Sequence, residues 1–212
     1  MTHRFANSLT HALTFCVMIC AGCSQLPTQY DLSSVLDTPI GSQKDKGSRK
    51  DQGSETDSRQ TQLWNDAKQA EEHGEFQIAI SRYSKLVEKF PNHAQGLHRL
   101  AVLQDQYGDP GESANLYLRA IHYSPNDPDL LCDYGYSRYV NGDLPLAEAT
   151  LRRCLKLDED HPRALINLGL VLTRQGNDQQ ALEAFQQAGL SRAEAQQNLH
   201  EARKNLELTD EG

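Results

Sequence analysis

One pattern of residues is written four times between residues 60 and 193, with a period of 34 and no insertion between copies. The pattern is carried by a turn glycine, a leucine, a small residue and a large residue in each copy. These columns are Gly74/Gly108/Gly142/Gly176, Leu63/Leu97/Leu131/Leu165, Ala67/Ala101/Gly135/Gly169 and Tyr83/Tyr117/Leu151/Phe185. A register kept over four copies restricts the chain to a repeat architecture.

Each copy has the apolar spacing of two helices joined by a turn. The first helix carries a stripe such as Leu97, Leu100 and Ala101, and the glycine that follows tolerates the left-handed conformation after a helix end. A single hairpin would leave half of its apolar surface in water, so the copies are expected to stack and bury it jointly.

The period and the columns resemble the tetratricopeptide repeat (TPR). The resemblance implies an all-α superhelix, or TPR solenoid, of four helix-turn-helix repeats at 60–93, 94–127, 128–161 and 162–193. The chain departs from the family pattern in two ways. The proline that closes the second helix is present as Pro91 and Pro125 but is replaced by Glu159 and Ala193. The only tryptophan, Trp64, lies one place beyond its usual column.

The residues after the repeats predict a capping helix at 194–208 and a disordered tail at 209–212. Ser191 and Glu194 have the spacing of a capping box, in which each side chain bonds to the backbone N–H of the other residue. The apolar side of this helix is expected to cover the last repeat, and its polar side to face water.

The first 22 residues have the features of a secretory signal. Arg4 precedes the apolar run 12–20, which is shorter than the ~20 residues needed to span a bilayer. The alternative is a buried or amphipathic helix. The exit Ala21-Gly22-Cys23 resembles the lipobox of bacterial lipoproteins, although Cys20 stands where leucine is usual. The resemblance implies a lipoprotein signal peptide at 1–22 and a lipidated Cys23.

The lipoprotein resemblance also implies a location. Ser24 is not the aspartate that marks retention in the inner membrane, so the outer membrane facing the periplasm is expected. Residues 23–59 are rich in Gly, Ser and mixed charges, which predicts a disordered tether. As a flexible coil, such a segment reaches roughly 30–36 Å.

The composition excludes several classes of function. The first 59 residues are balanced in charge, so the whole net charge of -8 lies on residues 60–212, and nucleic acid is a poor partner. The chain has no phosphate loop, nucleophile elbow or metal-binding motif, and its histidines are read as solvated surface residues. The acidic run 158–160 is either a cation site or, as we favour, a solvated turn. We expect no enzyme activity, cofactor, metal or small-molecule substrate.

Two cysteines, Cys132 and Cys154, lie in the repeats. A disulfide between them is conceivable in an oxidising compartment. Free thiols are favoured, because Cys132 falls on the groove-facing side of its helix and Cys154 falls in a small-residue column that faces the helix packing.

The TPR resemblance implies a concave binding groove lined by the first helix of each repeat. Its expected lining is Trp64, Lys68, His98, Val102, Cys132, Tyr136, Tyr139, Arg163, Ile166, Leu170 and Arg174. The lysine and asparagine with which some relatives clamp a terminal carboxylate are absent. Tyr136 and Tyr139 are the expected energetic centres for a partner peptide. The alternative is that several of these side chains pack on the adjacent repeat.

These features predict a membrane-anchored scaffold that binds a protein or peptide partner in the bacterial envelope. The stretch 189–199 resembles the tail of tight-adherence (Flp) pilus assembly lipoproteins, which implies a role in assembling a pilus or secretion complex. Two alternatives remain: an adaptor for peptidoglycan hydrolases or proteases, and an intracellular TPR interaction protein whose N-terminus is never processed.

Overall fold

The computed structural model describes residues 53–210, and the side chains of residues 55–204. The signal peptide, Cys23, the tether as far as residue 52 and the last two residues lie outside this range. The helices of the described range are α3 (Gly53–Glu72), α4 (Phe76–Lys89), α5 (Ala94–Tyr107), α6 (Pro110–Tyr123), α7 (Pro128–Val140), α8 (Leu144–Leu157), α9 (Pro162–Arg174), α10 (Asp178–Gln187) and α11 (Arg192–Asp210).

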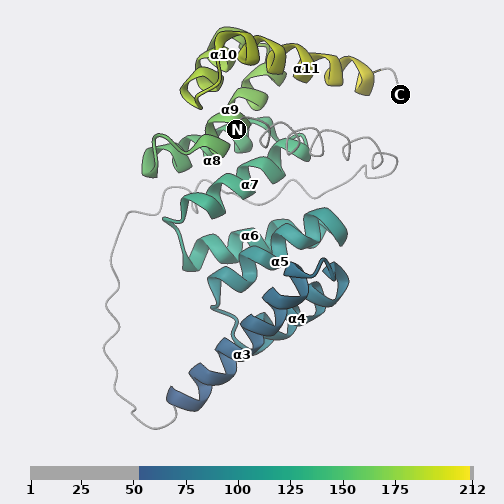
Figure 1. The fold of residues 1–212 in the computed structure, drawn as a ribbon, viewed down its shortest axis with the longest axis vertical. Coiled ribbons are helices and arrows are strands. Elements are labelled where there is room, and N and C mark those ends of the chain that lie inside the picture. The colour runs from purple at the N-terminus through teal and green to yellow at the C-terminus, as the bar shows by residue number, and fades with distance from the viewer. Residues whose placement is uncertain (1–52, 211–212) are drawn as a thin grey trace, which may run out of the picture. The chain divides into compact units, whose positions relative to one another are not determined.

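The helices pack in consecutive pairs, and the pairs stack in chain order. The four pairs are α3–α4, α5–α6, α7–α8 and α9–α10, and each second helix also packs on the first helix of the next pair. Figure 1 shows this succession from α3 to α10, with α11 crossing the last pair. The predicted all-α TPR solenoid of four repeats with a capping helix is therefore confirmed.

The small and large columns of the sequence meet inside each pair. In the last repeat, a Cβ added at Gly169 would lie 2.7 Å from two ring atoms of Phe185, and the Phe185 side chain is fully buried. In the third repeat, a Cβ at Gly135 would lie 2.7 Å from Cγ of Leu151. A side chain at either glycine would force the two helices apart. The close approach of the paired helices therefore explains why this column of the repeat holds small residues.

The turn glycines adopt the expected left-handed conformation in three of the four repeats, with φ between 75° and 81°. Gly108 is the exception, with φ -132°, and the expectation is wrong there. The side chain of Gln104 replaces the missing turn, because its Oε1 accepts a hydrogen bond of 3.0 Å from the backbone N–H of Asp109. The Gln104 side chain thus satisfies a backbone donor at this turn.

The first helix begins earlier than the sequence predicted. Residues 53–59 were assigned to the disordered tether, but α3 starts at Gly53, and its first turns project beyond α4 in Figure 1. Residues 55–59 are exposed, so packing does not hold this extension. Helix propagation adds one hydrogen bond per residue once a packed nucleus exists, and Glu55 lies at the positive end of the helix dipole.

The capping helix forms as predicted, with slightly wider bounds. Ser191 N–H donates to Glu194 Oε2 at 2.8 Å, and Glu194 N–H donates to Ser191 Oγ at 3.3 Å, which is the predicted capping box. The helix starts at Arg192 and continues to Asp210, so residues 209 and 210 belong to it and not to the predicted tail. It packs on α9 and α10, and buries Ala195 and Ala202.

No helix in the described range combines the length and apolar character that crossing a membrane requires.

Candidate functional site

The first helices of the four repeats, α3, α5, α7 and α9, form one surface, which we call the first-helix face. Neighbouring first helices contact each other directly at α5–α7 and α7–α9. Residues four apart on one helix lie on the same side, so His98 and Val102 share a side of α5, and Ile166 and Leu170 share a side of α9. Of the expected groove residues, Lys68, Tyr136 and Arg163 are exposed, Cys132 is buried and the others are half-buried.

The middle of this face carries an aromatic pair next to an arginine. The ring centroids of Tyr136 and Tyr139 lie 6.1 Å apart, and the Tyr136 residue is 41% exposed. The Arg174 guanidinium of the next repeat lies 5.8 Å from the centre of the Tyr139 ring, and its Nη1 donates to the Tyr139 carbonyl oxygen at 3.2 Å. The structure therefore brings the two predicted tyrosines together with one predicted arginine.

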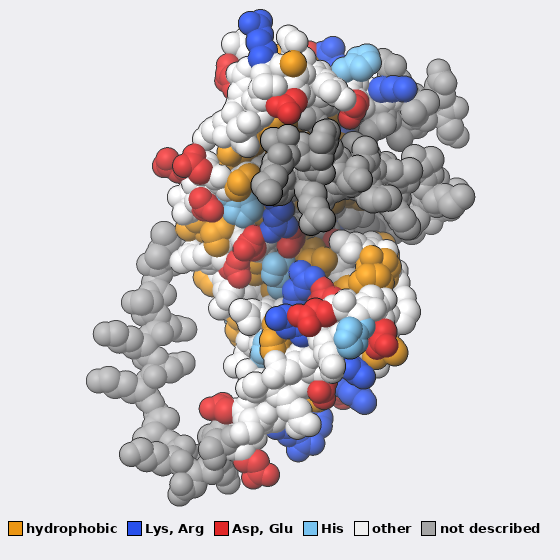
Figure 2. Space-filling model, in the orientation of Figure 1, with side chains coloured by type: hydrophobic (Ala, Val, Ile, Leu, Met, Phe, Trp, Pro, Cys, Tyr) orange, Lys and Arg blue, Asp and Glu red, His pale blue; other side chains and the backbone are white. Residues whose placement is uncertain are grey.

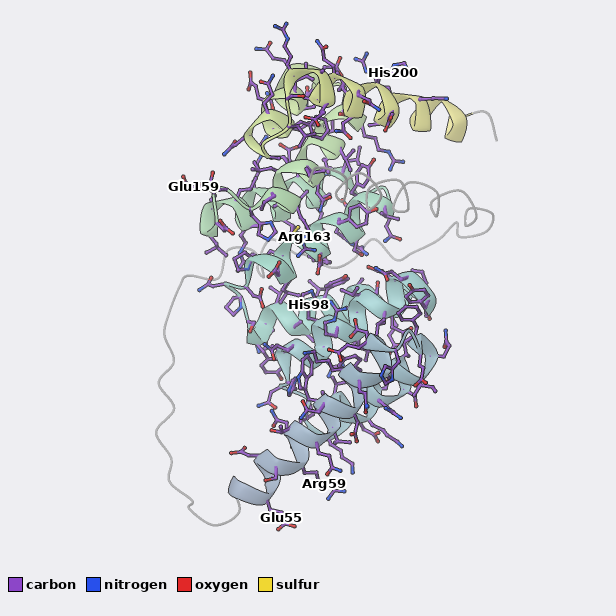
Figure 3. All side chains as sticks on the ribbon, viewed as in Figure 1. Glu55, Arg59, His98, Glu159, Arg163 and His200 are labelled. Carbon is purple, nitrogen blue, oxygen red and sulfur yellow. The ribbon has the colours of Figure 1, made fainter. Side chains whose placement is uncertain are left out.

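A chain of ionic contacts crosses the same face from α5 to α9. Asp133 of α7 lies between His98 of α5, with Nε2 to Oδ2 at 2.9 Å, and Arg163 of α9, with Nη1 to Oδ1 at 2.7 Å. Arg163 also donates to Asp129 at 2.5 Å. Figure 3 labels His98 and Arg163, and Figure 2 shows acidic, basic and histidine side chains side by side over the middle of the visible face.

Asp133 is the centre of this chain electrostatically as well as geometrically. Burial acts to raise its pKa, but the hydrogen bond from His98 and the charge of Arg163 outweigh burial and hold the pKa below its usual range. The folded state therefore favours the ionised carboxylate. Asp133 belongs to the packing between repeats 2, 3 and 4, and its charge is already matched there.

A second set of contacts joins the first two repeats. Arg99 of α5 forms an ion pair with Glu71 of α3, and Glu71 also accepts a hydrogen bond of 2.9 Å from the hydroxyl of Tyr83. Burial, together with the neighbouring Glu71 carboxylate, raises the pKa of Tyr83, so its hydroxyl remains a donor. These residues fix α3 against α5.

Cys132 was predicted to line the binding face, but it does not. It is fully buried, because Asn167 of α9 covers it, with Nδ2 3.5 Å from the sulfur. Cys154 is also buried, and its Sγ donates to the Pro128 carbonyl oxygen at 3.1 Å. Both thiols are free, and burial raises the pKa of Cys132 to about 12 and that of Cys154 to about 11. Thiols with such pKa values are poor nucleophiles at neutral pH.

Trp64 packs within the stack and contributes only part of its surface to the face. Its ring is stacked on His93 at 5.3 Å and meets the Tyr83 ring edge-on at 5.6 Å. For this residue the alternative of packing on the adjacent repeat applies, because His93 is the N-cap of α5, the first helix of the second repeat.

Three of the histidines, His93, His98 and His161, are structural and were wrongly read as solvated. His98 contacts Asp133, and the other two cap helices. His93 Nδ1 accepts a hydrogen bond from Gly96 N–H at 2.9 Å, and His161 Nδ1 accepts one from Ala164 N–H at 3.2 Å. Each ring therefore caps the N-terminus of a first helix, where Ser, Asp or Asn is the usual residue. Burial lowers the pKa of His93, which favours the neutral ring that this acceptor role needs.

The ionic partners Asp129, Asp133 and Glu71 were missed by sequence reasoning. A signal for one pair was present, since Asp129 and Arg163 carry opposite charges in the same column of consecutive repeats, 34 residues apart. Same-column charges meet when first helices stack. The pairing of Asp133 with His98 has no such signal, because the two residues occupy different columns.

Two hollows in the described structure lie along α3 and are lined by polar residues such as Asn65 and Asp66. Lys68 is the one expected groove residue among their linings.

Comparison with known proteins agrees with this architecture. Residues 97–208, more than half of the chain, match the family model described as the Cilia and flagella-associated protein 70 middle TPR-like domain. Tetratricopeptide repeat protein 8 of Caenorhabditis elegans is 29% identical over 92 residues, or 43% of this chain. The CTR9 homologue of Arabidopsis thaliana is 30% identical over 120 residues, or 54% of this chain. The chain spans only 18% and 11% of the lengths of these two proteins.

Solved structures have the same fold. The crystal structure of MamA protein superposes with a TM-score of 0.60 and 22% identity, over 72% of this chain and 85% of that one. PilF of Pseudomonas aeruginosa superposes with a TM-score of 0.57 and 22% identity, over 63% of this chain and 61% of that one. The chain therefore belongs to the TPR-like repeat family that the matching model describes, and is a protein-interaction scaffold of the TPR type.

Proposed function

We propose that this protein is a lipid-anchored scaffold of the bacterial envelope that binds a peptide or protein partner on its first-helix face. The observation that carries the binding proposal is the pair of exposed Tyr136 and half-buried Tyr139 on α7, beside Arg174 of α9. Tyrosine and arginine are enriched among the residues that dominate binding energy at protein interfaces.

The ion pairs of the first-helix face support this assignment, because they already occupy three of its cations. Arg163, Arg99 and Lys68 are each paired with a carboxylate of the chain itself. A partner would have to break these pairs to use those cations, which costs free energy. Covering the aromatic and apolar surface around Tyr136 would remove apolar area from water, which is favourable.

The groove proposal is tested with a double variant, Tyr136→Ala with Tyr139→Ala. Partners are captured from a detergent extract of the cell envelope on immobilised protein and quantified. We expect affinity for the captured partner to fall about 30-fold or more, because truncation of a hot-spot residue costs about 2 kcal/mol. Unchanged capture by a folded double variant would refute binding at this site.

A matched control removes apolar surface of similar exposure from the second helices. Tyr123, 46% exposed, ends α6, and Leu157, 40% exposed, ends α8. Tyr123→Ala with Leu157→Ala should capture the partner as well as the unaltered protein does. Circular dichroism establishes that both double variants keep the helical fold.

The proposed membrane anchor rests on the lipobox resemblance at Ala21-Gly22-Cys23. Two or three acyl chains on Cys23 would anchor the repeats stably, since each buried methylene contributes ~0.8 kcal/mol. Mass spectrometry of the protein purified from its own cells should find a chain that begins at acylated Cys23. An intact Met1 would reject the anchor and favour an intracellular TPR protein.

The proposed place of action is the assembly of a pilus or secretion complex. It rests on the resemblance of residues 189–199 to the tail of tight-adherence pilus lipoproteins. The partners captured in the experiment above test it directly. Components of a pilus or secretin would support this role, whereas a peptidoglycan hydrolase or protease would establish the adaptor role in its place.

A further inference from the structure

The cations of the first-helix face differ in whether a carboxylate of the chain pairs with them, and this bears on the chemistry of a partner. Lys68 pairs with Glu72, Arg99 with Glu71, and Arg163 with two aspartates. Arg174 has no carboxylate within ion-pairing distance among the described residues. Of the two arginines expected to line the groove, Arg163 and Arg174, it is thus Arg174 that has no carboxylate partner among the described residues.

Arg174 is nevertheless held in place. Its Nη1 donates to the carbonyl oxygen of Tyr139, near the C-terminal end of α7, and its guanidinium lies over the Tyr139 ring. A guanidinium carries five N–H donors, and the bond to Tyr139 uses one of them. A positioned guanidinium with donors left over is suited to a planar carboxylate, which it can bind with two parallel hydrogen bonds.

The surroundings of Arg174 on this face are apolar. Leu170 lies one turn earlier on the same side of α9 and is half-buried, and Val140, at the end of α7, is 50% exposed. Tyr136 is 41% exposed. A partner that covers these residues would remove water from around the guanidinium, and a carboxylate brought there would interact more strongly than it does in bulk water.

We propose that the partner segment carries one acidic side chain that pairs with Arg174, next to an aromatic or aliphatic residue that covers Tyr136 and Leu170. This inference rests on the proposed binding function of the first-helix face. The carboxylate is that of an internal Asp or Glu and not a chain end, because a clamp for a terminal carboxylate needs several converging donors and the neighbours of Arg174 are apolar.

The net charge of the protein favours a partner segment with one acidic residue over a segment with a run of them. Residues 60–212 carry the net charge of -8, which disfavours a run of acidic residues. At physiological ionic strength the Debye length is about 8 Å, so distant carboxylates of the repeats have little effect on a charge in contact with Arg174. Selectivity should therefore follow the spacing between one acid and one apolar residue, and not the overall acidity of the peptide.

The test is selection of random 12-residue peptides displayed on phage, whose C-termini are fused to the coat protein and so are blocked. The full mature chain is the target, with the Arg174→Gln and Arg174→Lys variants in parallel. We expect the unaltered protein to enrich peptides with one Asp or Glu at a fixed distance from an aromatic or aliphatic residue. A synthetic copy should bind Arg174→Gln about 10- to 100-fold more weakly, and Arg174→Lys with an intermediate loss.

A change in the peptide provides a second readout that does not depend on the folding of a variant. Replacing the acid of the selected peptide by its amide should weaken binding to the unaltered protein by a similar factor and have no further effect on Arg174→Gln. Enriched peptides without an acid, equal binding to Arg174→Gln, or independent effects of the two changes would each overturn the pairing with Arg174.

The same selection separates failure of this inference from failure of the proposed function. Selected peptides that lack an acid but lose binding to the Tyr136→Ala, Tyr139→Ala variant would leave the first-helix face as the binding site and refute only the role of Arg174. Peptides that bind this double variant as tightly as the unaltered protein would refute both. A failure to enrich any peptide would count against both as well.

Discussion

Replacing Phe185 by alanine should lower the free energy of unfolding by about 3–5 kcal/mol, the usual cost of truncating a buried phenylalanine. The ring is fully buried, and it fills the space left open by Gly169 on the facing helix. Gly169 has no side chain that could move into the space left by the ring. Urea unfolding followed by circular dichroism measures the change.

The loss should be concentrated at one end of the stack. In a solenoid each repeat contacts only its neighbours, so amide hydrogen exchange should accelerate in α9, α10 and α11 while α3 to α6 keep their protection. The control is Tyr123→Ala, which removes an aromatic ring that is 46% exposed and should change the stability by less than about 0.5 kcal/mol. A Phe185→Ala protein as stable as this control would contradict the proposed packing.

The Asp133→Ala variant should lose about 1.5–3 kcal/mol, the range for a hydrogen bond to a charged group whose partner stays partly buried. His98, with its side chain 12% exposed, would lose its acceptor, and Arg163 would keep only Asp129. Lys68→Ala is the control, since both side chains of the Lys68–Glu72 pair are exposed. This pair should contribute less than about 1 kcal/mol to the free energy of unfolding. Equal stabilities of the two variants would show that the chain of contacts across α5, α7 and α9 is not stabilising.

Acid should erase the difference between Asp133→Ala and the unaltered protein. The pKa of Asp133 is lowered in the folded state, so its carboxylate stabilises the fold above the ordinary aspartate pKa of 3.8. This contribution is lost as the pH falls through the lowered pKa. Unfolding curves recorded from pH 7 downwards should therefore converge in strong acid, and a difference that persists there would assign the effect of the substitution to packing.

The repeat architecture could be predicted from the sequence because its causes are local and repeated. The repeat spacing of 34 residues places Gly169 opposite Phe185 and Gly135 opposite Leu151. The same two columns recur in all four repeats, so the pattern can be recognised without the structure. The capping box at Ser191 was also predictable, since both of its partners lie within one helical turn.

The errors arose where contacts join different columns. Cys132 has the spacing of a groove residue, but Asn167 of the next repeat covers it, and the packing angle that brings Asn167 there is not encoded in the spacing. The turn at Gly108 involves the Gln104 side chain, which is particular to the second repeat. The early start of α3 is an effect of helix propagation, which composition alone does not reveal.

The candidate site was predictable as a face and only partly as a set of residues. Tyr136, Tyr139 and Arg174, which were each expected to line the groove, lie together. Arg163 was expected to line the groove as well, and Asp129 and Asp133 pair with it. Whether a cation has a carboxylate partner within the chain depends on side-chain geometry across three repeats. The cations that lack such a partner determine which charge a binding partner must supply.

The most direct measurement of the central claim is nuclear magnetic resonance of the isotope-labelled protein with a phage-selected peptide that carries a nitroxide spin label. Binding on the first-helix face predicts that the label broadens the amide signals of α5, α7 and α9, most strongly around Tyr136 and Arg174, and affects α4, α6 and α8 less. Broadening concentrated on α4, α6 and α8 would place the partner on the opposite side of the stack and contradict the account.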